Sequence, residues 1–236
     1  MAADIAQFKN TVGYEFKNRD LLKEALTHRS YASETQLSYD NQRLEFLGDA
    51  VVEIILSEYI FSLLPRSREG VMTKLRSALA QEPALAAMAR ALSLGDFLLM
   101  GRGERDSGGA ERDSILCDLF EAVTGAIYLD GGIDPARRFV LSAVGLTFPE
   151  PLKLLTMLNP KGTLQEYAQH RWGTQPEYAI VEKHGPDHLT TFVCEASIGG
   201  YRATGTGSGR RPAESDAARR IIEIIAGEDP SINEFY

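Results

Sequence analysis

Apolar residues recur at helical spacing over residues 41–64 and again over residues 114–129. Each stretch also carries two carboxylates on one helical face: Glu45 and Asp49 in the first, and Asp118 and Glu121 in the second. Neighbouring like charges oppose helix formation by roughly a few tenths of a kcal/mol. No lysine or arginine follows Arg43 in the first stretch, and none occurs in the second. The pattern therefore predicts two apolar helices whose acidic pairs need compensation from elsewhere.

Packing of these two helices together would bring the four carboxylates to one point, where their mutual repulsion calls for bound cations. Carboxylate oxygens suit Mg²⁺, with Mn²⁺ as a substitute. Two such ions about 4 Å apart can activate a water and stabilise the leaving oxygen of a phosphodiester. A di-iron bundle needs Glu-x-x-His pairs, and neither helix contains a histidine. Solvent-facing acids are the remaining alternative, and for the first pair alone we would favour them.

The first part of the chain is predicted to be helical throughout. Besides the two acidic helices, the periodicity predicts helices over residues 4–27, 71–100 (two helices, with Pro83 in a first turn) and 134–145. Two polar stretches separate these helices, and we predict loops for residues 32–41 and for the glycine-rich, mobile residues 101–113. The second stretch lacks the Lys-Ser/Thr ending and the preceding strand of a phosphate-binding P-loop.

The periodicity changes after a stretch with three prolines. A helix over residues 163–172, opened by a capping box of Thr163 with Glu166, precedes segments that alternate with period two. Strands are predicted at residues 178–183, 192–198 and 201–207, followed by a helix with Ala213, Ala217, Ile221 and Ile225 on one face. The chain therefore divides into an all-α domain at 1–150, a linker at 151–159, an α+β domain of order α-β-β-β-α at 160–227, and an acidic tail at 228–236.

Composition limits the classes of protein that remain. A chain of 236 residues is long enough for two domains. No apolar run approaches the roughly 18 residues of a membrane span, and residues 1–10 lack the basic and apolar segments of a secretory signal. Cys117 and Cys194 fall in different predicted domains, so we expect no disulfide between them. We therefore expect a soluble, cytoplasmic protein with no membrane association.

The net charge of −8 argues against a nucleic-acid binder when it is taken alone, but the charge is unevenly distributed. Residues 160–226 contain eight bases and eight acids, and the last ten residues add three acids and no base. Any affinity for RNA must therefore come from local clusters of bases. Arg210 and Arg211 lie where the last helix is predicted to begin. The positive end of the helix dipole disfavours cations there unless an anion such as phosphate is bound.

Longer motifs carry a resemblance to a known family. RLEFLGDAVV at residues 43–52 resembles the signature of the ribonuclease III family, and SILCDLFEAVTGAIYLD at residues 114–130 resembles its second acidic helix. ALTHRSY at residues 25–31 is similar to a third family segment. The resemblance implies a metal-dependent endonuclease for double-stranded RNA whose ligands are Glu45, Asp49, Asp118 and Glu121.

Three residues near these motifs need separate interpretations. Gln42 stands where bacterial members of the family usually have a glutamate, at a position outside the four implied ligands. We interpret His28 as a structural, hydrogen-bonding residue, because a two-metal mechanism needs no histidine. Glu53 continues the ridge of Glu45 and Asp49 but matches no family role, so we expect it in solvent or at a dimer edge.

The second predicted domain resembles a double-stranded RNA-binding domain. The matching segments are LQEYAQ at residues 164–169, GPDH at residues 185–188 and GTGSGRRPAE at residues 205–214. Such domains recognise A-form duplexes by shape, through phosphates and 2′-hydroxyls across successive minor grooves. The resemblance implies RNA contacts from Gln165, Glu166, His188, Arg210 and Arg211. Glu214 and Gly162 replace a base and a threonine of the usual pattern, which implies weaker or more salt-sensitive binding.

The sequence is thus identified as a member of the ribonuclease III family, with an all-α endonuclease domain followed by an α+β double-stranded RNA-binding domain. Membership implies hydrolysis of double-stranded RNA to 5′-phosphate and 3′-hydroxyl ends, and roles in rRNA and mRNA processing. Cutting both strands calls for two sites related by a two-fold axis, hence a homodimer, in which the family places Phe46 against the partner chain. The alternatives are an RNA-binding member that has lost catalysis and a helical scaffold with incidental acids.

Overall fold

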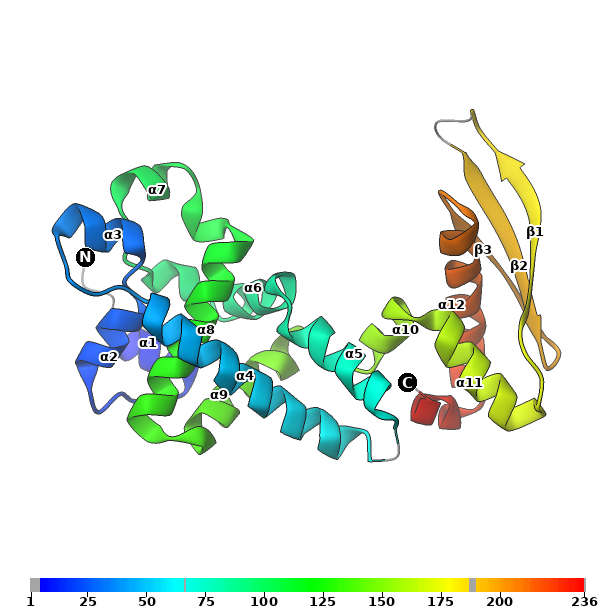
Figure 1. The fold of residues 1–236 in the computed structure, drawn as a ribbon, viewed down its shortest axis with the longest axis horizontal. Coiled ribbons are helices and arrows are strands. Elements are labelled where there is room, and N and C mark those ends of the chain that lie inside the picture. Colours follow the sequence, from blue (N-terminus) through cyan, green and yellow to red (C-terminus); the bar gives the residue numbers. More distant parts are fainter. Residues whose placement is uncertain (1–4, 66, 187–189, 236) are drawn as a thin grey trace. The chain divides into compact units, whose positions relative to one another are not determined.

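The computed structural model describes residues 5–65, 67–186 and 190–235, and the chain forms two compact units. Unit 1 comprises Met1–Leu63 and Arg76–Pro149, and unit 2 comprises Leu64–Leu75 and Glu150–Tyr236. The first unit is helical and the second combines helices with a sheet, which confirms the predicted fold class (Figure 1). Residues 64–75, which we assigned to the first domain from the sequence, group with unit 2. No described helix is long and apolar enough to cross a membrane.

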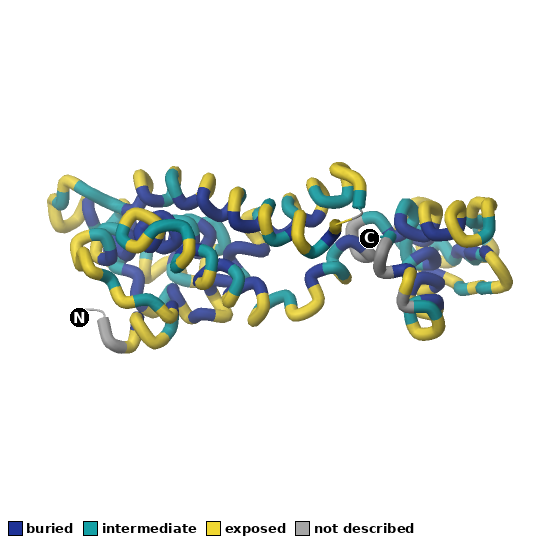
Figure 2. The backbone as a smooth tube through the Cα atoms, turned by 90° about the horizontal axis from the view of Figure 1, so that it is seen from below, coloured by how far each residue is buried: buried dark blue, intermediate teal, exposed yellow. Residues whose placement is uncertain are grey.

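Unit 1 is arranged around the helix α8. Its helices are α1 (Ile5–Val12), α2 (Arg19–Ala25), α3 (Arg29–Thr35), α4 (Gln42–Leu63), the end of α5 (Glu69–Ala80), α6 (Glu82–Ala91), α7 (Arg102–Asp106), α8 (Asp113–Gly131) and α9 (Ile133–Thr147), with 3-10 helices η1 (Leu94–Phe97) and η2 (Gly109–Glu111). Helix α8 packs against α4, α6 and α9 and is buried almost all round, as an apolar helix should be. Buried and exposed residues alternate along the other helices (Figure 2).

The end of α8 fastens the N-terminal segment to the rest of unit 1. The Asp130 carboxylate accepts hydrogen bonds from the backbone N–H groups of Lys17, at 2.7 Å, and Asn18, at 2.9 Å. The Tyr14 hydroxyl donates to the same carboxylate at 2.8 Å. Burial raises the pKa of Asp130, but these three donors outweigh burial and hold the pKa below its ordinary value.

Unit 2 is an antiparallel sheet with helices packed on one face. Its elements are α10 (Lys153–Leu158), α11 (Pro160–Trp172), β1 (Glu177–His184), β2 (Thr191–Ile198), β3 (Tyr201–Gly207), α12 (Arg210–Glu228) and the 3-10 helix η4 (Pro230–Phe235). The strand order is β1-β2-β3, with a register irregularity between Ile180 and Glu182. Helix α12 covers β2 and β3 and also packs on α11. This is the predicted α-β-β-β-α order, with a helix added at each end.

Two stretches that we predicted as loops in unit 1 contain helices. Helix α3 takes in residues 32–35, because His28 caps its first turn by accepting a hydrogen bond from the Ser30 backbone N–H. The second stretch, residues 101–113, contains α7 and η2 and ends at the first residue of α8. Its start is held by hydrogen bonds from the Gly101 N–H to Ser30 Oγ and from the Arg102 N–H to Glu34. These partners are distant in sequence, so local pattern did not indicate them.

Unit 2 also departs from the prediction at both ends. Helix α11 begins at Pro160, in the first turn that suits proline, so Thr163 lies inside the helix and the predicted capping box is wrong. The segment predicted as a linker contains α10. The acidic tail forms η4, where Ile232 is buried and the Phe235 ring meets the Tyr167 ring edge to face, with centroids 5.4 Å apart. Apolar burial therefore orders the tail despite its charge.

Candidate metal centre and RNA-binding surface

Helices α4 and α8 come unusually close because glycines lie at their crossing. A β-carbon on Gly125 of α8 would lie 2.4 Å from the carbonyl oxygen of Leu44 and 3.1 Å from the backbone nitrogen of Gly48, both in α4. Gly48 is closer still to α8, because a β-carbon there would lie 1.8 Å from the carbonyl oxygen of Glu121. No side chain fits at either position, so the two helix backbones are in direct contact. The acidic residues that flank the two glycines are consequently brought together.

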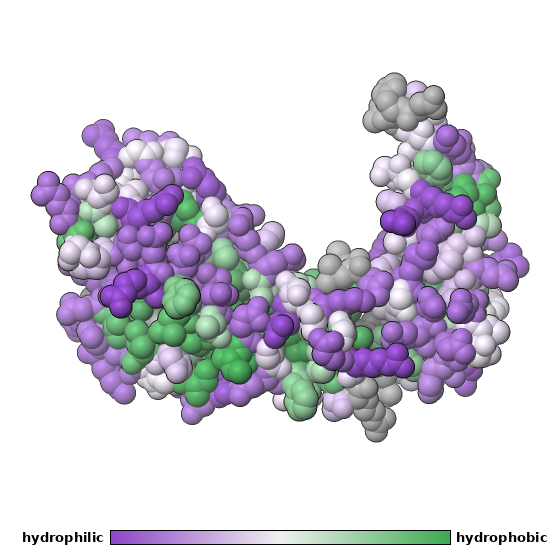
Figure 3. All heavy atoms as spheres, viewed as in Figure 1, coloured by the Kyte–Doolittle hydropathy of each residue, from purple (hydrophilic) through white to green (hydrophobic). Residues whose placement is uncertain are grey.

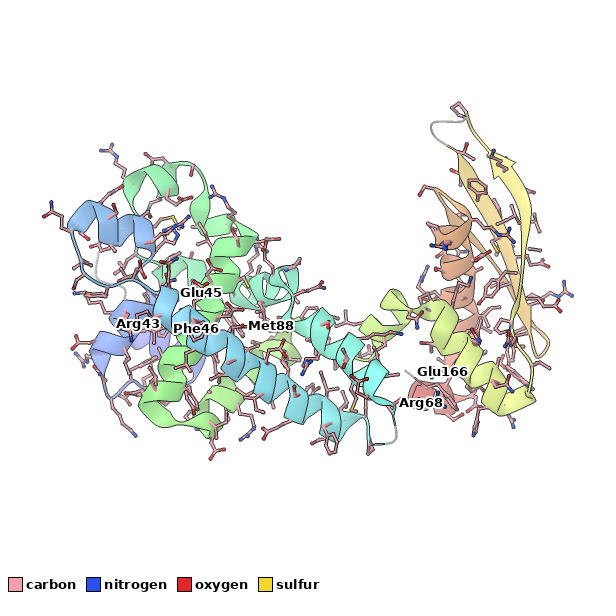
Figure 4. All side chains as sticks on the ribbon, viewed as in Figure 1. Arg43, Glu45, Phe46, Arg68, Met88 and Glu166 are labelled. Atoms are coloured by element: carbon pink, nitrogen blue, oxygen red, sulfur yellow. The ribbon has the colours of Figure 1, made fainter. Side chains whose placement is uncertain are left out.

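The structure places the four candidate metal ligands around this crossing. Burial raises the pKa of Glu121 to about 8, and the negative charges of Asp49, Asp118 and Glu45 contribute to that rise. Burial also raises the pKa of Glu45, with Asp118 as the next contribution. The four acids therefore form one electrostatically coupled cluster. Figure 4 labels Glu45 where α4 passes α8.

The four carboxylates of the cluster lack the ion-pair partners that other described acids of unit 1 have. Glu53, one turn beyond Asp49, pairs with Arg76 at 3.0 Å, and Glu58 pairs with Arg137 at 2.6 Å. Among the residues that the structure describes, none of the four candidate ligands makes an ion pair with a base. Glu53 is thus a half-exposed, ion-paired residue at the surface, and the expectation that it lies in solvent or at a dimer edge stays a prediction. The cluster keeps its oxygens available for a cation.

A cavity of about 250 Å³ opens beside this acidic cluster. Its walls include Glu45 and Asp118 together with His28, Gln42 and Arg112. His28 is buried and bonded to Ser30, at 2.7 Å between Nδ1 and Oγ, which fits its predicted structural role. The Gln42 side chain therefore lies next to the acids without adding a charge. Two of the four cluster acids, Glu45 and Asp118, therefore border a cavity.

Sequence analysis missed three residues near the acidic cluster. Arg29 of α3 partly offsets the raised pKa values of Glu45 and Asp118. Glu82, the first residue of α6, contributes after burial to the raised pKa of Asp118. Cys117 forms with Asp118 and Glu121 a group whose possible ligand atoms all lie within 4.8 Å of one another. Arg29 and Glu82 come from other helices, so only the fold reveals their proximity.

An exposed apolar face lies on unit 1 near the start of α4. The Phe46 side chain is 82% exposed, and Leu129 of α8 is 53% exposed. Both residues line a groove of about 720 Å³ together with Leu21 and Leu47. Figure 3 shows apolar side chains gathered over the region where Figure 4 labels Phe46. Exposed apolar area of this kind is typical of a protein interface.

In unit 2, Arg210 and Arg211 are the first two residues of α12, and both are exposed. Their N-cap residue is Gly209, which has no side chain that could cap the first turn. The nearly buried Glu214 accepts hydrogen bonds from Arg210 Nε, at 2.9 Å, and from the Lys161 ammonium. The Lys161 hydrogen bond, with help from Arg210, lowers the pKa of Glu214 despite burial. Arg211 has no ion-pair partner among the described residues, whereas Arg210 is shared with Glu214.

The remaining candidate RNA contacts lie on other parts of unit 2. Gln165 and Glu166 occupy the exposed side of α11, between the buried residues Leu164 and Tyr167. Figure 4 labels Glu166 on this helix. His188 lies outside the residues that the structure describes. Asn159 packs its side chain against Gly162, where a β-carbon would lie 2.1 Å from Nδ2, so a larger residue there would require the Asn159 side chain to move.

Comparison with known protein families matches both units. Residues 18–145 match the family model described as ribonuclease-III-like, and residues 160–225 match the double-stranded RNA binding motif. The first match contains all four acids of the cluster, and the second contains Arg210 and Arg211.

Individual relatives are similar in sequence to nearly the whole chain. Ribonuclease 3 of Pseudothermotoga lettingae is 40% identical over 230 residues, covering 95% of this chain and 97% of the relative. Ribonuclease 3 of Geobacter metallireducens is 41% identical over 221 residues, covering 92% and 90%. A solved nuclease domain of ribonuclease III from Campylobacter jejuni is 43% identical, with a TM-score of 0.58, and covers 62% of this chain and 99% of that domain. That structure is described with a region involved in dimer formation.

Proposed function

The chain belongs to the ribonuclease III family, and we propose that it cuts double-stranded RNA with two divalent cations held by the acidic cluster at the crossing of α4 and α8. It is a double-stranded RNA endoribonuclease, as the relatives and the two domain matches indicate. A requirement for a divalent metal goes with that family. The identity of the ion, the number of ions and the roles of individual residues are our proposal.

The donor set suits two magnesium ions. The cluster offers four carboxylates, Glu45, Asp49, Asp118 and Glu121, and oxygen donors of this kind are preferred by Mg²⁺ and Mn²⁺. The single observation that carries the proposal is the charge balance: the neighbouring acids help to raise the pKa values of Glu121 and Glu45, and none of the four has a base as an ion-pair partner among the described residues. Divalent cations would remove that repulsion. We propose Mg²⁺ as the natural ion.

The residues around the cluster would orient the substrate. The cavity lined by Arg112 and Gln42 admits a phosphodiester next to Glu45 and Asp118, and Arg29 lies close enough to influence both acids. The bound cations would supply an activated water and stabilise the departing oxygen. The carboxylates fix where these ions are held, and therefore which phosphorus is attacked. We propose products with 5′-phosphate and 3′-hydroxyl ends.

We propose that the enzyme acts as a homodimer. A two-fold interface uses the same surface on both chains, so a protruding side chain must meet a hollow on the same surface. Phe46 protrudes, and the groove beside it, lined by Leu21, Leu47 and Leu129, is such a hollow. The solved nuclease domain from Campylobacter jejuni is described with a region involved in dimer formation, which supports a dimer for this chain as well. Two acidic clusters would then face the two strands of one duplex.

Unit 2 would hold the duplex while unit 1 cuts it. We propose that Arg211, and in part Arg210, bind phosphates at the start of α12, where free backbone N–H groups and the helix dipole also favour anions. Gln165 and Glu166 on α11 would contact a minor groove, and His188 the next one. By family analogy we propose processing of rRNA and mRNA as the role. The two buried, free cysteines suit the reducing cytoplasm.

One incubation tests the catalytic proposal. Purified protein is mixed with long duplex RNA in the presence of Mg²⁺, of Mn²⁺, or of a chelator, and the fragment ends are then mapped. We expect cleavage only with a divalent ion, and fragments with 5′-phosphate and 3′-hydroxyl ends. Binding of duplex without cleavage under any of these ions would favour the alternative of a member that has lost catalysis. Cleavage in the chelator would refute the metal centre.

A further inference from the structure

We propose that Cys117, with Asp118 and Glu121, forms a binding site for thiophilic divalent cations such as Cd²⁺ and Zn²⁺, whose binding displaces the ions of catalysis and stops cleavage. The inference rests on the proposed function, because two of the three donors are proposed magnesium ligands. It adds a third donor of different chemistry, which neither the family matches nor the relatives assign. The site makes the enzyme sensitive to a class of metal ion that differs from its cofactor.

The geometry of the three donors suits a single ion. One ligand atom from each of Cys117, Asp118 and Glu121 lies within 4.8 Å of the others. The Cys117 Sγ and Glu121 Oε1 atoms are 3.8 Å apart. Zinc bonds of about 2.3 Å to sulfur and about 2.1 Å to oxygen, at a tetrahedral angle, separate the two donors by about 3.6 Å. The two side chains therefore need almost no movement to bind one ion.

The position of Cys117 in the fold separates it from an ordinary core cysteine. It precedes Glu121 by four residues on α8, so the two side chains lie on the same face one helical turn apart. The residue is 8% exposed, and within the described chain its thiol donates a hydrogen bond to the Glu121 carboxylate. Cys194, in contrast, is completely buried in β2, where its thiol contacts the Glu195 carbonyl oxygen at 3.5 Å. Within the part of the chain that the structure describes, Cys117 is the cysteine that belongs to a group of possible metal ligands.

The sulfur donor determines which metal ions bind at this site. Thiolates bind Zn²⁺ and other soft ions strongly, whereas Mg²⁺ takes oxygen ligands and leaves a thiol alone. On binding, the cation takes the place of the thiol proton, which passes to water, and the metal–sulfur bond forms without oxidation or reduction. Asp118 and Glu121 are then ligands of the thiophilic ion. They can no longer bind the two magnesium ions of catalysis. Magnesium at ordinary concentration therefore competes poorly with a thiophilic ion.

A spectroscopic titration of the full-length protein tests the site without relying on activity. Cd²⁺ is added in the absence of RNA, and the ultraviolet charge-transfer band of the cadmium–thiolate bond is recorded for wild type, Cys117→Ser and the matched control Cys194→Ser. We expect wild type and Cys194→Ser to give a band that saturates at one ion per chain, and Cys117→Ser to give none. Cys117→Ala serves as a second variant, and circular dichroism verifies that each protein is folded.

Inhibition provides the second measurement. Cleavage of duplex RNA in Mg²⁺ is measured against increasing Cd²⁺, and each variant is compared with its own rate without Cd²⁺. We expect wild type and Cys194→Ser to lose activity at a Cd²⁺ concentration at least about 10-fold lower than Cys117→Ser or Cys117→Ala, since even outer partners of a metal change its affinity by that factor. Equal inhibition of all proteins, or a wild type without a thiolate band, overturns the proposal. If cleavage still depends on Mg²⁺ in that event, the proposed function stands and only the role of Cys117 fails.

Discussion

A β-carbon on Gly48 of α4 would lie 1.8 Å from the backbone carbonyl oxygen of Glu121 in α8. Gly48 directly precedes Asp49, and Glu121 is itself a candidate ligand, so the tightest helix contact and the acidic cluster are at the same place. The missing side chain sets the distance between the two acidic pairs. Both the stability of unit 1 and its affinity for metal should therefore depend on Gly48.

Gly48→Ala should destabilise unit 1 by about 3 kcal/mol or more, because the new carbon would overlap a backbone atom that cannot rotate away. The helices would have to separate, which also moves Glu45 and Asp49 away from Asp118 and Glu121. Denaturant unfolding measures the first effect, and calorimetric titration with Mn²⁺ measures the second.

Gly145→Ala is the matched control for this change. Gly145 lies in α9, and nothing in the described chain lies within 4 Å of the place that a β-carbon would take there. Alanine there should be neutral or stabilising by up to about 1 kcal/mol, since glycine is the poorer helix former. Equal stability of the two variants would mean that the backbone contact between α4 and α8 is looser than the structure indicates.

Glu121→Gln should abolish cleavage while leaving duplex binding nearly unchanged, because it removes one metal ligand and touches no base of unit 2. We expect the cleavage rate to fall more than about 100-fold, beyond what loss of an outer partner produces. Rates on long duplex RNA in Mg²⁺ and filter binding in a chelator measure the two effects. Glu53→Gln, on α4 and paired with Arg76, is the control and should cut normally. A Glu121→Gln enzyme with near wild-type rate would remove the basis for the two-metal assignment.

Phe46→Asp should convert the proposed dimer into monomers, because a charge on this 82% exposed side chain could not enter an apolar groove on the partner. Sedimentation equilibrium measures the change in mass. Cleavage should fall with it, since each monomer carries only one acidic cluster. Val181→Asp, at a half-exposed apolar position in β1, is the control and should leave the mass unchanged. A Phe46→Asp protein that sediments like wild type would place the dimer interface elsewhere.

The sequence predicted those helices and strands that leave a periodic pattern in neighbouring residues. The apolar period located α4 and α8, and alternation located the strands, because burial of one face leaves a direct trace in the order of residues. The acidic pairs were visible for the same reason: each pair lies within one helical turn. The family matches support the fold class that these patterns indicated.

The features that sequence missed depend on contacts between distant residues. Helix α3 and the segment after Met100 are ordered through His28, Ser30 and Glu34, and the last two lie about 70 residues from the backbone groups that they hold. Arg76 neutralises Glu53 from another helix. Ile232 and Phe235 are too few and too close to the chain end to give a periodic signal, although the burial of Ile232 accompanies an ordered acidic tail. No local pattern contains such partners, so a single sequence cannot supply them.

Asp130→Asn should lower the stability of unit 1 at neutral pH, because the charged carboxylate accepts three hydrogen bonds that an amide accepts less well. The folded-state pKa of Asp130 is depressed, so this stabilisation is complete above the unfolded pKa of about 3.9 and disappears as the pH falls through the lower folded value. We expect a difference of about 1 kcal/mol at pH 7 that shrinks below about pH 4. Denaturant unfolding at several pH values measures this difference.

Asp134→Asn, an exposed acid on α9, is the control and should show no such trend. A difference that grows towards low pH would contradict the role given to the carboxylate.

Replacing Arg210 and Arg211 together by alanine should weaken duplex binding to a similar extent for every sequence, because both side chains would contact phosphates and no base edge. Each phosphate contact adds about one to the slope of log affinity against log salt concentration. Arg210 already shares its Nε with Glu214, whereas Arg211 pairs with no acid that the structure describes, so the slope should flatten by between about one and two. Filter binding of several unrelated duplexes across a range of salt concentrations provides the measurement.

Arg220→Ala is the control. Arg220 lies nine residues after Arg211 on α12, hence on the opposite side of the helix, and it pairs with Asp216. Loss of binding to some duplex sequences and not others would show that these arginines read bases, and an unchanged slope would show that they do not meet phosphate at all.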